Sequence, residues 1–158
     1  MHRINPHIEI ICHTERLTAD NVTTLFSAYD IIVDGSDNFA TRYLIADHAA
    51  LLEKALVTAA MGRFDGSLTV LKPYERDSAG TAYPHYRDLF PEPPPEGLLP
   101  SCAEAGVIGA LPAILGSLQA MEVIKLITGI GEPLVGRLLL YDALSARFET
   151  IRYKRQPE

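Results

Sequence analysis

A short apolar strand pattern that ends in two closely spaced carboxylates constrains this chain more than any other feature of its sequence. Residues 31–33 are Ile-Ile-Val, a run typical of a parallel strand buried on both faces. A polar turn with Asp34 and Asp37 follows, and a segment without Gly or Pro then predicts a helix over residues 39–54. In an open α/β sheet, ligands bind outside the carboxyl ends of the strands, where this turn would lie. Both carboxylates are therefore candidates for chemistry.

Two interpretations of this turn compete. Two carboxylates within four residues can hold a hard divalent cation such as Mg²⁺, which prefers oxygen ligands and commonly bridges to phosphates. Alternatively, Asp34 and Gly35 form the turn, and Ser36 or Asp37 caps the following helix. Arg42 lies just over one helical turn beyond Asp37, and its guanidinium suits a carboxylate or a phosphate, although a lone arginine is more often a surface residue. Local chemistry leaves both interpretations open.

The composition excludes several classes of protein. A chain of 158 residues with 47% hydrophobic and 22% charged residues is typical of one globular domain. The net charge of −6 argues against nucleic-acid binding, and no apolar run approaches the roughly 20 residues needed to cross a bilayer. The first residues lack the apolar core of a signal peptide, so a cytoplasmic location is expected. The two cysteines, Cys12 and Cys102, are too few for a disulfide framework.

The patterns before the carboxylate turn predict that the chain opens with a strand. Residues 7–12 are rich in β-branched side chains and favour a strand, with Cys12 in the core. A short helix is expected over residues 19–26, with Thr18 as its N-cap. With the strand at 29–34, these segments predict a right-handed crossover between parallel strands.

The patterns after the turn complete an α/β fold with a mixed, mostly parallel sheet. Strands are expected at 55–60 and 66–71, and the short Gly-containing gap between them predicts that the sheet becomes antiparallel there. Apolar residues at helical spacing predict the longest helix within 106–127. The last two strands, at 136–142 and 147–153, are expected to form an antiparallel hairpin.

Residues 73–105 form the longest stretch without a regular pattern. A loop of about thirty residues in a compact domain is uncommon and is usually functional or disordered, and this one favours a lid or a strap across the sheet. Cys102 lies shortly before a predicted helix, whose positive end would favour the thiolate. A reactive thiol and a small residue packed at the base of the loop both fit this position. His85 and Asp88 have no companions at ligand spacing and do not predict a metal site.

Six motifs follow one another in a characteristic order: Asp34 to Arg42, Gly62 to Gly66, Tyr86 to Pro91, Ser101 to Val107, Gly116 to Leu126 and Leu140 to Ala143. Together they resemble the ThiF/MoeB (HesA) family of ubiquitin-activating-like adenylyltransferases over residues 4–155. The resemblance implies a Rossmann-like fold, of which this chain would be the C-terminal part. It also implies an enzyme that uses MgATP to adenylate the C-terminal glycine of a ubiquitin-like sulfur carrier of the ThiS or MoaD type. Such carriers serve molybdopterin, thiamine or related sulfur metabolism.

The resemblance also implies roles for individual residues. Asp37 matches the carboxylate that serves Mg²⁺ and ATP, with Asp34 and Asn38 beside it as further cofactor-binding residues. Arg42 matches the basic residue next to the nucleotide and the carrier tail. Cys102 matches the cysteine that becomes covalently linked to the activated carrier in sulfur-transferring members. The loop from Pro73 to Pro100 matches the crossover strap under which the carrier tail passes.

The sequence departs from the family pattern in two places. Many members hold a structural zinc with two Cys-x-x-Cys pairs, and His85 and Asp88 at the first pair imply the zinc-free MoeB/MoeZ-like subgroup. The family's nucleotide-binding half, with its Gly-rich phosphate loop, would precede Met1, and no G-x-G-x-x-G occurs in the chain. We therefore expect one partial domain over 1–158 that is inactive alone.

Two other kinds of molecule share this sequence pattern. The chain could be a non-catalytic module that binds a carrier or forms a dimer, or it could be one half of a split enzyme. A partial sheet leaves an apolar edge and face uncovered, which favours pairing with another chain. The expected assembly is therefore a homodimer, or a complex with a separate N-terminal half.

Overall fold

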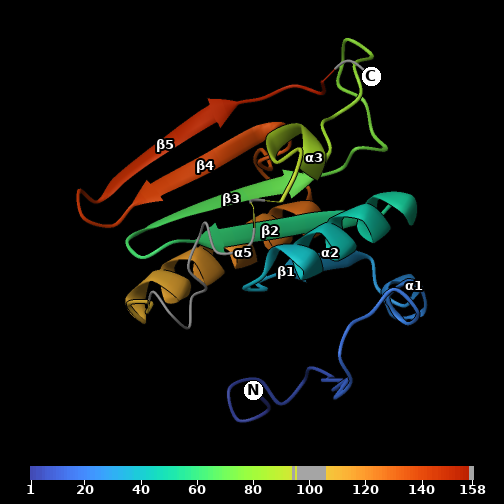
Figure 1. Cartoon of the computed structure of the whole chain (residues 1–158). Helices are drawn as coiled ribbons and strands as arrows, with labels where there is room; N and C mark the ends of the chain where they lie inside the picture. Colours follow the sequence, from blue (N-terminus) through green and yellow to red (C-terminus); the bar gives the residue numbers. More distant parts are fainter. Residues whose placement is uncertain (94, 96–105, 157–158) are drawn as a thin grey trace.

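Five strands form one continuous sheet in the computed structural model of the chain, which describes residues 1–93, 95 and 106–156. The strands lie side by side in the order in which they occur along the chain (Figure 1). They are β1 (Ile31–Asp34), β2 (Ala55–Met61), β3 (Asp65–Leu71), β4 (Arg137–Asp142) and β5 (Arg147–Arg152). The strands predicted at these places are confirmed, and their order means that each one pairs with its neighbour in sequence.

The sheet is mixed, as predicted, but it is not mostly parallel within this chain. β1 and β2 pair in parallel, with Asp34 opposite Thr58. The pairs β2–β3, β3–β4 and β4–β5 are all antiparallel. The change of direction comes at the tight connection after Met61, where the amide of Gly62 donates to the carbonyl of Asp65 at 2.9 Å. Because a turn this short cannot carry a crossover, the strand that follows must be antiparallel.

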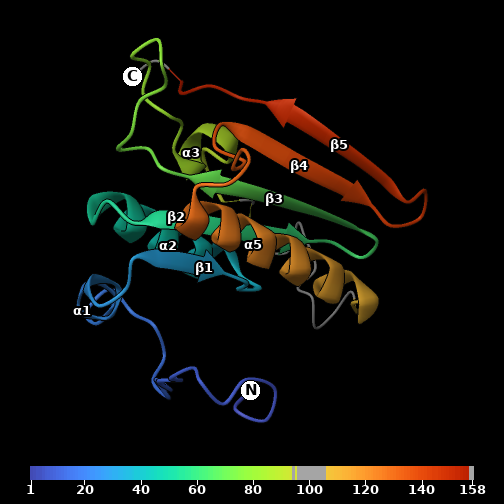
Figure 2. The ribbon, with the colours of Figure 1, turned by 180° about the vertical axis from the view of Figure 1, so that it is seen from behind.

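Helices cover both faces of the sheet. The helices α2 (Phe39–Leu51) and α3 (Tyr86–Leu89) lie on one face, and α5 (Ala110–Thr128) crosses the other, which Figure 2 shows from behind. One core cluster packs between the sheet and α2, and a second packs beneath α5. Helix α2 ends three residues before the predicted Lys54, whereas α5 begins inside the predicted range 106–127 and ends one residue beyond it.

Helix α5 approaches the sheet closely at Gly66 of β3. A Cβ atom built on Gly66 would collide with Cδ1 of Leu115, a side chain that is itself buried. Glycine at this position therefore sets the distance between the helix and the sheet. The helix ends at Gly129, whose φ of 71° is the left-handed conformation that glycine adopts without strain.

The N-terminal segment contradicts the prediction of a strand. Residues 7–12 form no strand, and Cys12 is exposed rather than in the core. The expected crossover between parallel strands is therefore wrong, and the short helix α1 (Val22–Ser27) starts three residues later than predicted, after Asn21 rather than Thr18. β-branched side chains favour extended backbone, but a strand forms only where a neighbour pairs with it. In the described part of the chain, this segment runs away from the sheet (Figure 1).

Helix α5 is long and apolar enough to cross a bilayer, which contradicts the expectation that no segment reaches that length. Length and composition alone do not separate a membrane span from the core helix of a globular protein. In this fold Leu111 and Leu115 of α5 are buried against the strands β2 and β3. The buried carboxylate of Glu122 accepts from the amide of Leu134 at 2.8 Å and binds Lys125 at 2.5 Å, so it joins the helix to the loop before β4.

The expected loop over residues 73–105 falls partly outside the described residues. Its described part is not without regular structure, because it contains α3 and a bridge between Arg76 and Ala82. Cys102 lies outside the described residues, as do the other residues from 96 to 105.

Candidate functional site

Asp34, at the carboxyl end of β1, is buried and uses both carboxylate oxygens within the protein. Its side chain is 2% exposed. The hydroxyl of Thr58 on β2 donates to Oδ2 at 2.9 Å, and the amide of Ser36 donates to Oδ1 at 2.8 Å. The bond to Ser36 folds the chain back immediately after the strand, as an Asx-turn does. Asp34 therefore builds the turn and does not present its carboxylate to a ligand.

Gln119 holds the same strand end from the opposite side. This side chain on α5 is buried, and its Nε2 donates to the carbonyl of Asp34 at 2.8 Å and to the carbonyl of Val57 at 3.3 Å. Buried backbone carbonyls at the end of a strand need such donors, since an unpaired one costs free energy. Gln119 was not among the residues predicted for the site. Its spacing of four residues from Leu115, on the face that α5 buries, is the signal that could have identified it.

Arg42 lies beneath the turn and is only 8% exposed. Its Nη2 donates to the carbonyl of Ser36 at 2.5 Å. Burial raises the pKa of Tyr86 on α3, while the nearby charge of Arg42 acts in the opposite direction. Arg42 thus supports the turn from inside and places a positive charge under it.

Ser36 carries an unusual polar atom in this turn. Its hydroxyl oxygen is buried and has no hydrogen-bond partner among the described residues. Buried polar atoms are almost always paired, by protein or by water. This oxygen is therefore a polar group that a bound water or ligand could satisfy.

The start of α2 carries the two remaining residues of the predicted site. Asn38, rather than Ser36 or Asp37, is the N-cap, and its Oδ1 accepts from the amide of Thr41 at 2.9 Å. Asp37 is exposed, and within the described residues its side chain accepts a single 3.3 Å hydrogen bond, from Nδ2 of Asn38. The structure thus confirms that Asp34 forms the turn and corrects the cap to Asn38, while the exposed carboxylate of Asp37 leaves the magnesium interpretation as a prediction.

The donor set at this turn fits Mg²⁺ only as a partner of a phosphate ligand. The described residues contain no group of three or more His, Cys, Asp or Glu side chains that could hold a metal by themselves. Mg²⁺ keeps several waters and is commonly bound by one or two carboxylates together with substrate phosphates. A single exposed carboxylate such as Asp37 can serve that arrangement. The N-terminus of the 13-residue helix α2 next to it favours anions.

His85 and Asp88 have a structural role in the described part of the chain. The carboxylate of Asp88 accepts from the amide of His85 at 2.6 Å, which caps α3. Its other oxygen accepts from the amide of Gln156 at 2.8 Å. One carboxylate therefore ties α3 to the C-terminal segment.

Comparison with known proteins identifies one family and several close relatives. The model of the ThiF family matches residues 1–158. The chain is 49% identical over 154 residues to a sulfur carrier protein adenylyltransferase of Thermus thermophilus, covering 98% of this chain and 56% of that protein. It is also 49% identical over 154 residues to the probable adenylyltransferase/sulfurtransferase MoeZ of Mycobacterium tuberculosis, of which it covers 38%. The chain therefore spans about half of these relatives, or less.

A solved structure shares the fold at low sequence identity. A crystal structure of E. coli MccB with MccA matches with a TM-score of 0.75 and 13% identity. The match covers 99% of this chain and 46% of that one. The arrangement of sheet and helices is thus common to both proteins.

Proposed function

Because this chain belongs to the ThiF family, we propose that it forms part of an enzyme that adenylates the C-terminal glycine of a small ubiquitin-like sulfur carrier with MgATP. The names of its 49% identical relatives, an adenylyltransferase for a sulfur carrier protein and a probable adenylyltransferase/sulfurtransferase, support this reaction. Pathways of molybdopterin, thiamine or related sulfur metabolism are the proposed setting, and the cytoplasm is the proposed location.

The observation that carries the proposal is the division of work between two carboxylates of one turn. Asp34 has both oxygens in hydrogen bonds, whereas Asp37, three residues on, is exposed at the N-terminus of α2. A carboxylate that has a defined position, but whose oxygens are not needed for hydrogen bonds that stabilise the fold, can bind a ligand. Mg²⁺, when bound with ATP, would neutralise phosphate charge there, and Asp37 is the side chain proposed to hold it.

The remaining residues of the turn have proposed roles around Asp37. Asn38 fixes the first turn of α2, so the helix amides keep their direction toward the phosphates. Arg42 holds the Ser36 carbonyl and contributes positive charge from below. Asp34 acts through the geometry of the turn. In this proposal Asp37 binds the Mg²⁺ that accompanies ATP, and the other three residues keep Asp37 in position.

The reaction proposed at this site is a displacement at phosphorus. A carboxylate oxygen of the carrier's C-terminal glycine attacks the α-phosphorus of ATP and forms the new O–P bond. The bond from that phosphorus to the bridging oxygen breaks, and pyrophosphate leaves with the electron pair. Positioning and charge stabilisation, rather than acid–base chemistry, account for most catalysis in such transfers.

Cys102 is the proposed acceptor in the following step. Its thiolate would attack the acyl carbon of the adenylate, the C–O bond would break, and AMP would leave as a thioester forms. The residue lies outside the described part of the chain, so this role rests on the family motif. Loss of a hydroxylamine-sensitive thioester adduct between carrier and protein in Cys102→Ser, with adenylation retained, is the expected result.

Further groups for ATP binding are proposed to come from outside these 158 residues, since the sequence contains no G-x-G-x-x-G phosphate loop. The chain alone is accordingly proposed to be inactive, as a monomer or as a homodimer, and a nucleotide-binding half is proposed to complete the active species. Carrier-dependent ATP–pyrophosphate exchange by the isolated chain would refute this part of the proposal.

A chimera tests the activity directly. The 154 matching residues of the Thermus thermophilus relative would be replaced by those of this chain, and carrier-dependent ATP–pyrophosphate exchange would be measured. Exchange is expected, and Asp37→Asn in the chimera should reduce it by about 100-fold or more, since even indirect support of a metal is worth 10–100-fold. Asp20→Asn is the matched control, because Asp20 is an exposed aspartate before α1 that belongs to none of the family motifs. A folded chimera without exchange, or equal losses in the two variants, contradicts the assignment.

A further inference from the structure

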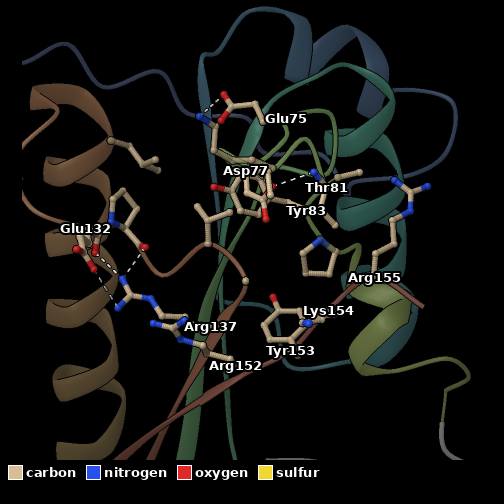
Figure 3. A pocket seen from close by; sticks show the side chains of 18 of the residues that line it. Glu75, Asp77, Thr81, Tyr83, Glu132, Arg137, Arg152, Tyr153, Lys154 and Arg155 are labelled. Carbon is tan, nitrogen blue, oxygen red and sulfur yellow. Dashed lines mark hydrogen bonds and ion pairs between the residues drawn. The ribbon is translucent and has the colours of Figure 1, made fainter. Parts of the chain in front are cut away.

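A second polar region lies on the far side of β2 and β3 from the carboxylate turn. An open groove of about 770 Å³ runs between the segment after β3, the loop between α5 and β4, and the end of β5 (Figure 3). We call it the basic groove because five of its lining residues are cationic and three are acidic. The cations are Lys72, Arg137, Arg152, Lys154 and Arg155, and the acids are Glu75, Asp77 and Glu132.

Two arginines of this groove face each other across neighbouring strands. Arg137 begins β4 and Arg152 ends β5, and the register pairs them directly. Residues directly opposite in an antiparallel pair project to the same face, and like charges there are destabilising. Figure 3 shows the two guanidinium groups side by side at one end of the groove. A protein with a net charge of −6 thus places two positive charges against each other.

The protein offers little compensation for this pair. Arg137 donates from Nη2 to the carbonyls of Glu132 and Pro133 at 3.0 and 2.9 Å, and its Nη1 lies 3.6 Å from a carboxylate oxygen of Glu132. The side chain of Glu132 is 87% exposed, so this ion pair is weak. Arg152 has no hydrogen bond or ion pair with any residue that the structure describes. One arginine is therefore fixed in place, and the other is free to bind.

We propose that Arg137 and Arg152 form a binding site for the phosphate or carboxylate group of a small molecule. The planar guanidinium groups of two neighbouring arginines match the oxygens of such a group, and an anion between them would replace their mutual repulsion by two attractions. Val135, Pro133 and Leu126 supply apolar wall beside the pair, which suits the organic part of a ligand. Lys154 adds a further cation on the same side of the molecule.

This site is independent of the proposed adenylation. Its two arginines lie on β4 and β5, whereas Asp34 and Asp37 follow β1, and two strands separate them. Loss of either site would not by itself imply loss of the other. The assay therefore measures binding to this chain and not enzymatic turnover.

Calorimetric titration with inorganic phosphate, and separately with succinate, tests the proposal at constant ionic strength with chloride as the reference anion. We expect saturable binding of at least one oxyanion to the unmodified chain and binding about tenfold weaker in Arg152→Gln, because a hydrogen bond to a charged group is worth about that factor. Arg147→Gln is the matched control, since Arg147 lies on the same strand but pairs with Asp142 and Glu149 at the other end of the hairpin. It should bind as the unmodified chain does.

Thermal unfolding provides a second readout that does not depend on affinity alone. In low salt without oxyanion, Arg152→Gln should melt at the same temperature as the unmodified chain or higher, because it removes a repulsion. Phosphate or succinate should then raise the melting temperature of the unmodified chain by more than that of the variant. Stabilisation by phosphate alone or by succinate alone would identify the preferred group and support the site. No saturable binding, or equal weakening in Arg147→Gln and Arg152→Gln, would overturn it.

Discussion

The carboxylate turn after β1 and the basic groove at β4 and β5 treat their charged groups in opposite ways. At the turn, Asp34 is buried with each carboxylate oxygen in a hydrogen bond, and Arg42 is buried against the Ser36 carbonyl. In the groove, Arg152 lies opposite another cation and has no partner in the described residues. The difference indicates which charges build the fold and which are left for a ligand.

Burial explains the difference. A buried charge must be paired within the protein, because otherwise the free-energy cost of removing it from water exceeds the free energy gained by burial. The turn sits at the junction of the sheet, α2 and α5, and Asp34 is buried there. The groove is open to solvent, so water can hydrate an unpaired arginine at moderate cost. Asp37 is part of the turn in the sequence, but its side chain is exposed to solvent as that of Arg152 in the groove is.

The largest expected effect is loss of stability on replacing Asp34. Asp34→Ala leaves the Thr58 hydroxyl and the Ser36 amide without their acceptor in a buried place, which should cost about 3 kcal/mol of unfolding free energy. Asp37→Ala, as the exposed neighbour, should stay within about 0.5 kcal/mol. Urea denaturation measures both. Equal costs for the two variants would remove the distinction between buried and available carboxylates.

Alkaline pH tests Tyr153, a groove residue whose hydroxyl meets the buried hydroxyl of Thr69 at 2.8 Å. Burial raises the pKa of Tyr153 from 10.0 to about 12, with the hydrogen bond to Thr69 acting in the opposite direction. Between pH 10 and 12 the unfolded chain loses this proton while the folded chain keeps it. The stability contributed below pH 10 is therefore lost as the pH rises to 12, by about 2.5 kcal/mol.

Tyr153→Phe should flatten this pH dependence. Part of the slope should remain, because burial also raises the pKa of Tyr86. Unfolding free energies from pH 9 to 12 would be compared with those of Tyr29→Phe, which changes an exposed ring. A variant with the slope of the unmodified chain would show that Tyr153 titrates alike in both states.

Gln119 should contribute somewhat less than Asp34. Gln119→Leu keeps the volume but removes the donor to the Asp34 and Val57 carbonyls, for an expected cost of about 2 kcal/mol. Ser117→Ala on the same helix changes an exposed hydroxyl and is the control. Denaturation midpoints and slopes provide the measurement. If Gln119→Leu is neutral, α5 does not hold the end of β1 through this side chain.

The smallest expected effect is at the helix cap. Asn38→Ala removes the acceptor for the Thr41 amide and should cost about 1 kcal/mol. Asn38→Asp keeps an acceptor at the same place and should cost only a few tenths. A large loss in the aspartate variant would mean that the amide nitrogen of Asn38, which bonds Asp37 at 3.3 Å, matters more than the cap.

Local patterns predicted the five strands and the central helices because each carries a strong signal of its own. The Ile-Ile-Val run before Asp34, the Gly-containing turn after Met61 and the glycine after Thr128 all mark elements that the structure contains. The failure at residues 7–12 has the opposite cause. Extended propensity was present there, but pairing depends on another segment, and no local signal reports whether one is available.

For the candidate site too, motifs of neighbouring residues were informative, whereas contacts between residues far apart in the sequence could not be predicted. The order of motifs from Asp34 to Ala143 was sufficient for the family, which the match over residues 1–158 confirms. It could not separate the roles of Asp34 and Asp37, since the separation depends on Thr58 and Gln119, 24 and 85 residues away. It also could not reveal that Arg137 and Arg152 meet.

By itself, therefore, the sequence determined the elements, the family and the turn that carries the candidate site. Only the tertiary structure decided that Asp34 is buried and hydrogen-bonded while Asp37 is exposed, and that two arginines lie opposite each other on neighbouring strands. The physical reason is that secondary structure and motifs depend on neighbours along the chain, whereas burial and charge pairing depend on neighbours in space. Sheet register brings those neighbours together.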